Sequence, residues 1–427
     1  MKLVVEAKGA LRGEITVPGD KSVSHRAAIL GALAEGETVI SGFLSGEDCL
    51  ATVRCLRRLG VEIAVDGGDV RVKGAGLYGL AEPDDVLDCG NSGTTARLLL
   101  GVLAGQPFFS VLTGDASLRR RPMGRVTKPL QEMGASFCGR QGGNVLPLAV
   151  QGGSLSAINY RTPVASAQLK SAILLAGLFA EGETVITEPE KSRDHTERML
   201  AAFGAQLNVS GNIVRLAGRP RLTGRAIAVP GDISSAAFFL VAAAIVPGSE
   251  VLVRNVGTNP TRTGILDVLR QMGARVDLLH PRSFGGEPVA DLMVRPGKLR
   301  GVEIGGPLVP RLIDELPVLA VAALFADGRT VVRDARELRV KETDRIAAIA
   351  EELAKIGGAV TPTEDGFIIE GGRRLAGGTA DSRHDHRMAM ALAVAGLRAD
   401  APVCIDNAEC VNVSFPNFAA TLAGLQG

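Results

Sequence analysis

A pattern of polar and apolar positions occurs six times along the chain, and in each copy a short polar loop opens onto a long apolar run. The copies are GDKSVSHRAAILGALAEG, DCGNSGTTARLLLGVLAG, VASAQLKSAILLAGLFAEG, GDISSAAFFLVAAAIVPG, LIDELPVLAVAALFADG and DHRMAMALAVAGLRAD. Their starts are spaced by roughly 65 to 80 residues, a period that indicates a repeat architecture. Each apolar run predicts a helix that begins where its polar loop ends.

The sequence after each helix completes the repeating element. A Gly followed by a β-branched segment, such as ETVI or RTVVRDA, predicts a helix end and then a strand. Five of the six repeats then contain an amphipathic segment that ends at Gly: TVRCLRRLG, RVTKPLQEMG, ERMLAAFG, DVLRQMG and EELAKIG. The first helix of each repeat is apolar on all faces and must be buried, whereas the second has a charged side that faces solvent. The pattern therefore predicts an α/β fold with buried helices and outer strands.

The tetrapeptide VPGD occurs at residues 17–20 and again at 229–232, two equivalent points about half the chain apart. We interpret both copies as hinges. Repeats one to three then form one domain over residues 18–231. Repeats four to six form the other domain together with the N-terminal strand, over residues 1–17 and 232–427.

The charge and the aromatic content narrow the class of protein. Lys plus Arg number 47 and Asp plus Glu 46, so the net charge of +1 supplies no global field for nucleic acid or an anionic membrane surface. Any anion must therefore be bound by a local group of cations. The chain has 13 Phe, 2 Tyr and no Trp, so base-stacking platforms are scarce and the core must be built from small aliphatic side chains.

The cysteines and the apolar runs favour a cytoplasmic location. The six cysteines form no CxxC pair, and no His lies at metal-ligand spacing from them, so we interpret them as reduced thiols. The longest apolar run, FFLVAAAIV, is far shorter than the roughly 20 residues that span a bilayer. The N-terminus has a strand-like period and lacks the apolar block of a signal peptide.

The polar loops place charged and amide-bearing residues at helix N-termini, where free N–H groups favour anions. In the first loop Lys21, Ser22 and Arg26 offer a cation, a hydroxyl and a guanidinium that suit phosphate or carboxylate. The alternative for this loop is Ser22 or Ser24 as an N-cap with solvated charges beside it. For the whole chain, the corresponding alternative is a repeat scaffold without chemistry.

The second repeat contributes a glycine-containing loop and an arginine-rich stretch. Gly90 and Gly93 allow a ligand to approach the backbone closely, although an ordinary capped helix start would have the same sequence. In RRRPMGR most of the charges are expected to be solvated. Arg121 is held next to Pro122 and has the stiffest setting.

The third loop carries Ser166 and Gln168 at a helix start, and Arg193 follows close to a capping pattern. For Lys170 and His195 we favour a structural role.

Carboxylates come from the second half of the chain. Asp314 directly precedes an apolar helix, where full solvation is not expected and an acid therefore needs a functional reason. In RVKETDR, Lys341 and Arg345 share one helical face with Glu342 beside them; the alternative is a salt-bridged first turn at the surface. The sixth loop adds Asp385 and Arg387.

Seven of these motifs, in their order along nearly the whole chain, resemble the 5-enolpyruvylshikimate-3-phosphate synthase family. They are PGDKSVSHR, DCGNSGTTARL, RRRPMGR, VASAQLKSA, LIDELP, RVKETDR and DHRMAMA. The resemblance implies a monomer of two inside-out, barrel-like α/β domains, each of three repeated units with buried helices and outer sheets. It also implies that the two domains close on substrates in the cleft between them.

The resemblance further implies a reaction in chorismate and aromatic amino-acid biosynthesis. The enolpyruvyl group of phosphoenolpyruvate is transferred to the 5-hydroxyl of shikimate 3-phosphate through a tetrahedral intermediate, and phosphate is released. By this resemblance Asp314 takes the hydroxyl proton, while Glu342 and Lys21 are the candidates for delivering a proton to the methylene carbon. No metal, nucleotide or organic cofactor is implied, and neither nucleic acid nor a membrane is an expected partner.

The resemblance also assigns the binding residues. For phosphoenolpyruvate they are Lys21, Gly93, Arg121, Gln168, Arg345 and Arg387, with Lys21 and Arg121 at the phosphate and the last two arginines at the carboxylate. For shikimate 3-phosphate they are Lys21, Ser22, Arg26, Ser166, Gln168, Arg193, Asp314 and Lys341.

Two departures and one alternative accompany this interpretation. Many relatives have a Lys where this chain has Val413, so that phosphate contact is absent or replaced. The loops VASAQ and SRDHTERM resemble a bacterial branch often tolerant of glyphosate, in which Ala can stand at Gly93; with Gly93 in place, we expect glyphosate to compete with phosphoenolpyruvate. The alternative is the sister enolpyruvyl transferase acting on UDP-N-acetylglucosamine, but the reactive Cys of its mobile loop is absent from GDASLRRRPMGR.

Overall fold

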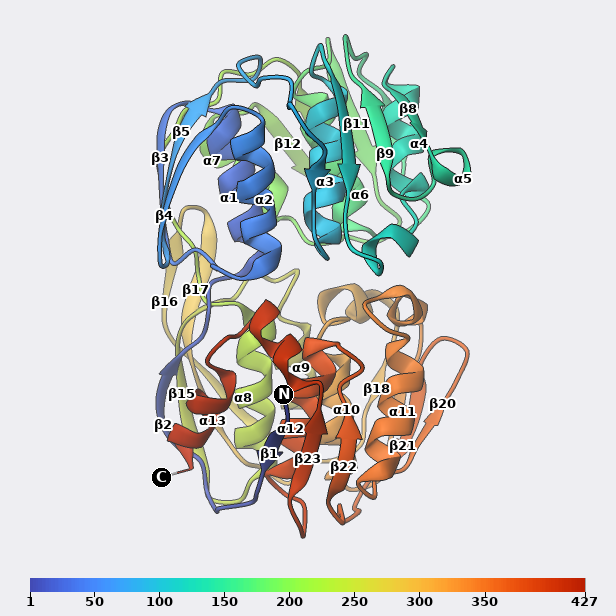
Figure 1. Ribbon diagram of the computed structural model, residues 1–427. Helices are drawn as coiled ribbons and strands as arrows, with labels where there is room; N and C mark the ends of the chain where they lie inside the picture. Colours follow the sequence, from blue (N-terminus) through green and yellow to red (C-terminus); the bar gives the residue numbers. More distant parts are fainter. Residues whose placement is uncertain (427) are drawn as a thin grey trace. The chain divides into compact units, whose positions relative to one another are not determined.

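The computed structural model describes residues 1–426, which form two compact units (Figure 1). Unit 1 comprises Met1–Pro18, Pro230–Ser283 and the described residues from Pro288 onward. Unit 2 comprises Gly19–Val229 and the short segment Phe284–Glu287. Among residues 1–426, no helix is both long and apolar enough to cross a membrane.

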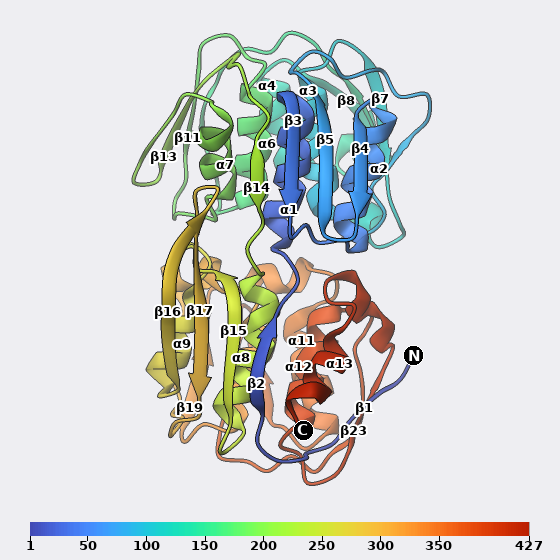
Figure 2. The same ribbon diagram turned by 90° about the vertical axis from the view of Figure 1, so that its left-hand side faces the viewer.

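Three four-stranded sheets surround three buried helices in unit 2, and one of these sheets lies in front of the helices in Figure 2. The buried helices are α1 (Lys21–Leu33), α3 (Gly93–Ala104) and α6 (Ala167–Gly177), and the partly exposed ones are α2 (Glu47–Arg58), α4 (Gly124–Glu132) and α7 (His195–Phe203). The first sheet has the order β14 (Ala226–Ala228), β3 (Glu35–Ser41), β5 (Asp69–Ala75), β4 (Glu62–Asp66). The second is β6 (Leu87–Asp88), β7 (Phe109–Thr113), β9 (Leu148–Gln151), β8 (Ser136–Gly139). The third is β10 (Asn159–Arg161), β11 (Glu183–Thr187), β13 (Ile213–Ala217), β12 (Leu207–Ser210), and short turns η1 (Leu118–Arg120) and α5 (Arg140–Gly143) lie in the connections.

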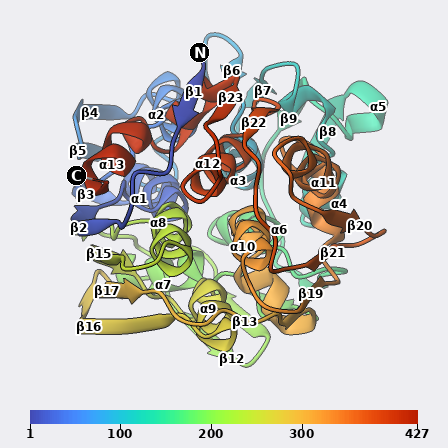
Figure 3. The same ribbon diagram turned by 90° about the horizontal axis from the view of Figure 1, so that it is seen from below.

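Unit 1 repeats this plan, and Figure 3 shows its three buried helices side by side inside the sheets. They are α8 (Ile233–Ile245), α10 (Leu316–Leu324) and α12 (His386–Gly396), accompanied by α9 (Gly264–Met272), α11 (Arg345–Lys355) and α13 (Phe418–Leu425). The first sheet has the order β16 (Arg275–Phe284), β17 (Glu287–Arg295), β15 (Glu250–Gly257), β2 (Arg12–Thr16). The second is β18 (Glu303–Ile304), β19 (Arg329–Val332), β21 (Phe367–Glu370), β20 (Val360–Pro362). The third is β1 (Leu3–Val5), β23 (Val403–Asp406), β22 (Gly378–Asp381), and the 3₁₀ turns are η2 (Gly306–Arg311), η3 (Arg336–Val340) and η4 (Ala408–Val413).

Each complete repeat has the order strand, buried helix, strand, outer helix and hairpin. In the second repeat, for example, β6 and β7 are parallel on either side of α3, and β9 lies antiparallel to both β7 and β8. The predicted fold class of buried helices and outer sheets is confirmed. The sixth repeat is incomplete, because it has no hairpin after β23. Instead β1 pairs with β23 at the hairpin position, and the short helix α13 follows β23 in the sequence.

In both units a strand from a distant part of the sequence completes the first sheet. β14 pairs in parallel with β3 in unit 2, with Ile227 opposite Ile40. β2 pairs in parallel with β15 in unit 1, with Leu252 opposite Glu14. The first repeat of unit 2 therefore takes its first strand from the C-terminal end of that unit, and the first repeat of unit 1 takes its first strand from the N-terminal segment that precedes unit 2 in the sequence.

Small residues let the buried helices pack closely. A Cβ atom added to Gly101 of α3 would lie 2.3 Å from the backbone oxygen of Ala172 in α6. All residues of α8 are buried, and the rings of Phe238 and Phe239 pack against Phe418. In a core with few aromatic side chains, the helices thus pack through close contact between their backbones.

Candidate active site

In unit 2 the candidate site begins at the N-terminus of α1. Asp20 is the N-cap and accepts a hydrogen bond from the backbone of Val23 at 3.0 Å, so the alternative of a Ser N-cap is wrong. Lys21 Nζ lies 3.1 Å from Asp48 Oδ2, which belongs to the first turn of α2. This ion pair holds the ammonium group at the helix start, where the free backbone N–H groups also favour an anion.

Arg26 is on the next turn of α1 and is buried. Its Nε donates to Thr196 Oγ1 at 2.6 Å, its Nη2 to Ser171 Oγ at 2.7 Å and its Nη1 to the Ser22 carbonyl at 3.0 Å. All three acceptors are neutral. Burial lowers the pKa of Arg26 to about 10, against the opposing charge of Glu197.

The start of α3 brings a glycine, an amide and a guanidinium together. Ser92 caps the helix, and Asn91 Oδ1 accepts a hydrogen bond from Arg121 Nη2 at 3.0 Å. A Cβ atom on Gly93 would lie 3.3 Å from Arg121 Nη1 and 2.7 Å from Arg97 Nη1. Gly93 therefore leaves the space in which Arg121 takes its position.

The start of α6 is tied to the start of α3. Ser166 is the N-cap of α6, and Gln168 Nε2 donates to Thr94 Oγ1 at 2.8 Å. The other amide atom, Gln168 Oε1, is buried and accepts no hydrogen bond within residues 1–426. Arg193 lies two residues before α7 and is partly buried.

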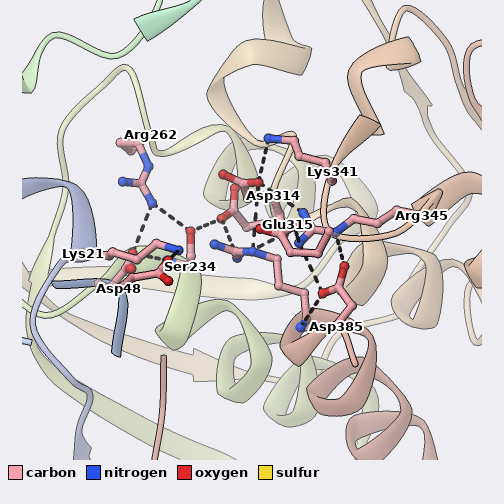
Figure 4. Close-up of polar contacts among 12 residues, drawn as sticks. Lys21, Asp48, Ser234, Arg262, Asp314, Glu315, Lys341, Arg345 and Asp385 are labelled. Carbon is pink, nitrogen blue, oxygen red and sulfur yellow. Dashed lines mark hydrogen bonds and ion pairs between the residues drawn. The ribbon is translucent and has the colours of Figure 1, made fainter. Parts of the chain in front are cut away.

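In unit 1 the carboxylate of Asp314 is surrounded by cations (Figure 4). Asp314 Oδ1 lies 3.2 Å from Lys341 Nζ, 3.3 Å from Arg345 Nη1 and 4.0 Å from Arg387 Nε. Lys341 and Glu342 directly follow η3, while Arg345 begins α11 and Arg387 lies on the first turn of α12. Starts of different elements thus converge on one carboxyl group.

Arg345 is the centre of this cluster and its side chain is only 1% exposed. Its Nε lies 2.8 Å from Asp385 Oδ2, and its Nη2 lies 2.6 Å from Glu342 Oε2. Burial alone would lower the pKa of Arg345, but the charges of Asp385 and Glu342 outweigh burial and raise it. Arg345 therefore stays charged in a buried setting.

A second buried network joins α8 to α10 and was not predicted. Arg262 Nη2 donates to Ser234 Oγ at 2.7 Å and lies 3.1 Å from Asp232 Oδ1. Ser234 in turn donates to Glu315, whose Oε1 lies 3.9 Å from Arg387 Nη1 (Figure 4). Nothing in the linear spacing of Asp232, Arg262 and Glu315 signals that they meet.

The predicted residues thus fall into two sets, one in each unit. The set in unit 2 contains Lys21, Ser22, Arg26, Gly93, Arg121, Ser166, Gln168 and Arg193. The set in unit 1 contains Asp314, Lys341, Glu342, Arg345 and Arg387. The surface alternative for Arg345 is wrong, because its guanidinium is buried.

Other residues singled out in the sequence have structural surroundings. Lys170 is fully buried between Glu188 and Glu197, and His195 contacts Glu287 at 2.8 Å, which agrees with the structural role favoured for both. Val413 ends η4 and is partly buried. Within residues 1–426, no group of three or more His, Cys, Asp or Glu side chains could hold a metal ion.

Comparison with known proteins gives consistent results along the whole chain. The sequence model described as EPSP synthase (3-phosphoshikimate 1-carboxyvinyltransferase) matches residues 5–422. A 3-phosphoshikimate 1-carboxyvinyltransferase from Desulforudis audaxviator (strain MP104C) is 61% identical over 427 residues, which is 100% of both chains. One from Pelotomaculum thermopropionicum (strain DSM 13744 / JCM 10971 / SI) is 61% identical over 425 residues, 99% of this chain and 98% of the relative. A solved structure of EPSP synthase from Acinetobacter baumannii is 50% identical and superposes with a TM-score of 0.89, covering 100% of this chain and 98% of that one.

Proposed function

The chain belongs to the EPSP synthase family, and on that premise we propose that it is a 3-phosphoshikimate 1-carboxyvinyltransferase. The enzyme transfers the enolpyruvyl group of phosphoenolpyruvate to the 5-hydroxyl of shikimate 3-phosphate and releases phosphate. The observation that carries the proposal is the Asp314 cluster, where one carboxylate and three cationic side chains meet at helix and loop starts. A base beside cations matches a reaction that deprotonates a hydroxyl and binds an anionic donor.

In this proposal Asp314 accepts the proton of the attacking hydroxyl. The hydroxyl oxygen adds to the central carbon of phosphoenolpyruvate while the methylene carbon takes a proton and becomes a methyl group. The tetrahedral intermediate then loses phosphate while the methyl group gives up a proton, which restores the carbon–carbon double bond of the enolpyruvyl group. Glu342 and Lys21 are the candidates for the proton donor, and they form ion pairs with Arg345 and Asp48 respectively. A bound substrate would therefore have to displace or share the ion pairs of these two side chains.

The cations divide between the two anionic groups of phosphoenolpyruvate. Lys21 and Arg121 bind its phosphate, with Gly93 and Gln168 lining the site. Arg345 and Arg387 bind its carboxylate, for which guanidinium groups are geometrically suited. Arg345 already donates four of its five N–H groups, to Asp385 (two), Glu342 and Asp314, so that one N–H of Nη1 is available to the ligand.

Shikimate 3-phosphate is held by residues of both sets. The assigned residues are Lys21, Ser22, Arg26, Ser166, Gln168, Arg193, Asp314 and Lys341. Buried Arg26 supports this assignment, because its guanidinium is bonded only to neutral oxygens and retains its charge for an anion.

The segments 17–20 and 229–232 serve as hinges in this proposal, and the enzyme is a cytoplasmic monomer.

One assay distinguishes the proposed function from transfer to UDP-N-acetylglucosamine. Phosphate release from phosphoenolpyruvate is measured with shikimate 3-phosphate and with UDP-N-acetylglucosamine in turn. We expect phosphate release when shikimate 3-phosphate is the acceptor and none when UDP-N-acetylglucosamine is the acceptor. Release only with the nucleotide sugar would support the sister transferase, and release with neither acceptor would support an anion-binding protein without this activity.

Inhibition by glyphosate tests the placement of Gly93. A methyl group there would approach Arg121 Nη1 to 3.3 Å, so the wild-type glycine leaves room beside the guanidinium. We expect glyphosate to raise the KM for phosphoenolpyruvate without lowering kcat, and Gly93→Ala to weaken this inhibition. Steady-state rates at millimolar glyphosate that equal the uninhibited rates of the wild-type protein would contradict the expectation.

A further inference from the structure

Unit 2 contains a buried cluster of charges that the proposed reaction does not use. Lys170 of α6 is fully buried, with its Nζ 2.7 Å from Glu188 Oε2 and 2.7 Å from Glu197 Oε1. Glu188 directly follows β11, and Glu197 lies on the first turn of α7. The ammonium group of Lys170 therefore connects α6 to the end of β11 and to the start of α7 in the core of unit 2.

The residues next to these charges are the ones that hold Arg26. Ser171 follows Lys170, Thr196 precedes Glu197, and their hydroxyl oxygens lie 2.6 Å apart. Arg26 donates to both hydroxyls, through Nη2 at 2.7 Å and Nε at 2.6 Å. The ion pair between α6 and α7 thus clamps together the two acceptors that set the plane of the guanidinium.

The same lysine fixes the loop that carries Arg193. Lys170 Nζ donates to the Ser192 carbonyl at 3.4 Å, and the Ser192 backbone N–H donates to Glu188 Oε2 at 3.3 Å. Ser192 immediately precedes Arg193 in the chain. The backbone before Arg193 and the two hydroxyl acceptors of Arg26 therefore both lie next to one buried ammonium group.

The charge balance of the cluster supports this arrangement. Two carboxylates share one lysine, and Glu197 also interacts favourably with the charge of Arg26. Burial opposes the charge of Lys170, but Glu197 and Glu188 outweigh it and raise its pKa. The second carboxylate of the cluster compensates the charge of Arg26, whose hydrogen bonds include no carboxylate. Arg26 uses three of its five N–H groups in these hydrogen bonds, so two remain for a ligand.

We propose that Lys170 is a positioning residue for the binding of shikimate 3-phosphate: by bridging Glu188 and Glu197 it holds Arg26 and Arg193 in their binding geometry. Lys170 touches no substrate in this proposal and acts through its neighbours. The choice of shikimate 3-phosphate as the ligand rests on the proposed function. The placement of the arginines does not.

The main test uses Lys170→Met with two readouts. Calorimetric titration with shikimate 3-phosphate should show a dissociation constant about 10- to 100-fold above wild type, because hydrogen bonds to a charged group are lost. The KM for phosphoenolpyruvate should change by less than about threefold, since neither arginine contacts that substrate. A folded Lys170→Met variant with an unchanged dissociation constant would overturn the proposal.

Two controls separate positioning from general damage. Glu197→Gln keeps an oxygen that accepts from Lys170 but loses the charge that interacts with Arg26, so its dissociation constant should rise less than that of Lys170→Met; a loss as large as that of Lys170→Met would overturn the geometric role. Lys355→Met removes a lysine from another carboxylate, Glu352 of unit 1 at 2.7 Å, and should leave binding unchanged. Weaker binding in this variant to the same degree would also count against the proposal.

A further variant addresses the cost of two unpaired buried carboxylates. Combining Lys170→Met with Glu188→Gln and Glu197→Gln removes every charge of the cluster, so the variant can fold without an unpaired ion. Crystal structures of this variant and of wild type then show directly whether Arg26 keeps its bonds to Ser171 and Thr196; if it does, Lys170 does not position it. Should wild type bind no shikimate 3-phosphate, the proposed function fails while these structures still decide the role of Lys170.

Discussion

Single residues in the unit 1 cluster combine binding with stability. Arg345 forms ion pairs with Asp385, Glu342 and Asp314 in a buried setting. Arg345→Ala should therefore lower the free energy of unfolding by about 3–5 kcal/mol, because it leaves buried carboxylates without their cation. Urea denaturation followed by circular dichroism measures this loss, with the exposed Arg336→Ala as a control that should lose little. A loss below about 1 kcal/mol would contradict the central place of Arg345.

Asp314 should contribute mainly to the chemical step. Asp314→Asn keeps the shape of the side chain but removes its ability to accept the hydroxyl proton, so kcat should fall by roughly 10²- to 10⁴-fold. The KM for phosphoenolpyruvate should change modestly, because its assigned ligands remain. Steady-state kinetics at saturating shikimate 3-phosphate give both values, and a kcat close to wild type would exclude Asp314 as the base.

His25 should make the protein sensitive to acid. It is buried beside Thr52, and burial lowers its pKa from 6.5 to about 3. The unfolded chain therefore binds one more proton than the folded chain between these values. The contribution of neutral His25 to the free energy of unfolding is complete above about pH 6.5. It falls by about 1.4 kcal/mol per pH unit as the pH decreases toward 3.

This dependence can be isolated by substitution. The glutamine of His25→Gln does not titrate in this range. The free energy of unfolding of wild type should therefore fall by about 2 kcal/mol more than that of the variant between pH 6.5 and pH 5. Urea titrations at the two pH values provide the comparison. Equal slopes for the two proteins would contradict a buried neutral His25.

The sequence was informative about which residues are candidates and uninformative about their partners. Lys21 and Arg26 stand out because charge is unusual at the start of an apolar helix, and Arg345 stands out because Lys341 and Glu342 lie close to it in the sequence. Their partners Asp48, Thr196 and Asp385 come from other helix starts. Packing decides those pairs, since similar polar residues occur at many other turns.

At the scale of elements, the alternation of polar loop and apolar run predicts the buried helices well. α1 begins at Lys21 and α8 at Ile233, each after a capping Asp. Strand pairing is harder to predict, because it joins residues far apart and the β-branched segments are interchangeable in composition. The parallel partners β2 and β14 could not be assigned to β15 and β3 from their own short sequences.

These strand pairings lead to a prediction about fragments. Residues 19–229 contain every strand of the unit 2 sheets and should fold alone. Residues 230–427 lack β1 and β2, which leaves β23 and β15 without a partner on one edge, and should not unfold cooperatively by circular dichroism.

A circular permutant is the matched control. Gln426 Nε2 donates to the Glu6 carbonyl at 2.9 Å, and Met1 lies on the other side of β1 from Glu6, so a flexible linker of about ten residues can join the two segments. Residues 230–427 followed by a linker and residues 1–18 should regain cooperative unfolding. Cooperative unfolding of residues 230–427 without these strands would show that β1 and β2 are dispensable.

At the scale of the whole molecule, the near-neutral composition conceals a local concentration of cations. Lys341, Arg345 and Arg387 gather at one carboxylate, while many other arginines pair with glutamates on the surface. A net charge of +1 therefore fits a protein that binds small anions. It is the grouping of the cations that carries function, and only the fold determines that grouping.

The borrowed strand β2 also affects the order of events during synthesis. Residues 12–16 leave the ribosome early, yet their partner in β15 begins at Glu250, and β1 waits for β23 at residues 403–406. At about 5–20 residues per second, β1 stays without its partner for roughly 20 to 80 seconds. Unit 2 can complete its sheets during this interval, so a nascent chain has one finished unit attached to an exposed N-terminal segment that a chaperone or protease can reach.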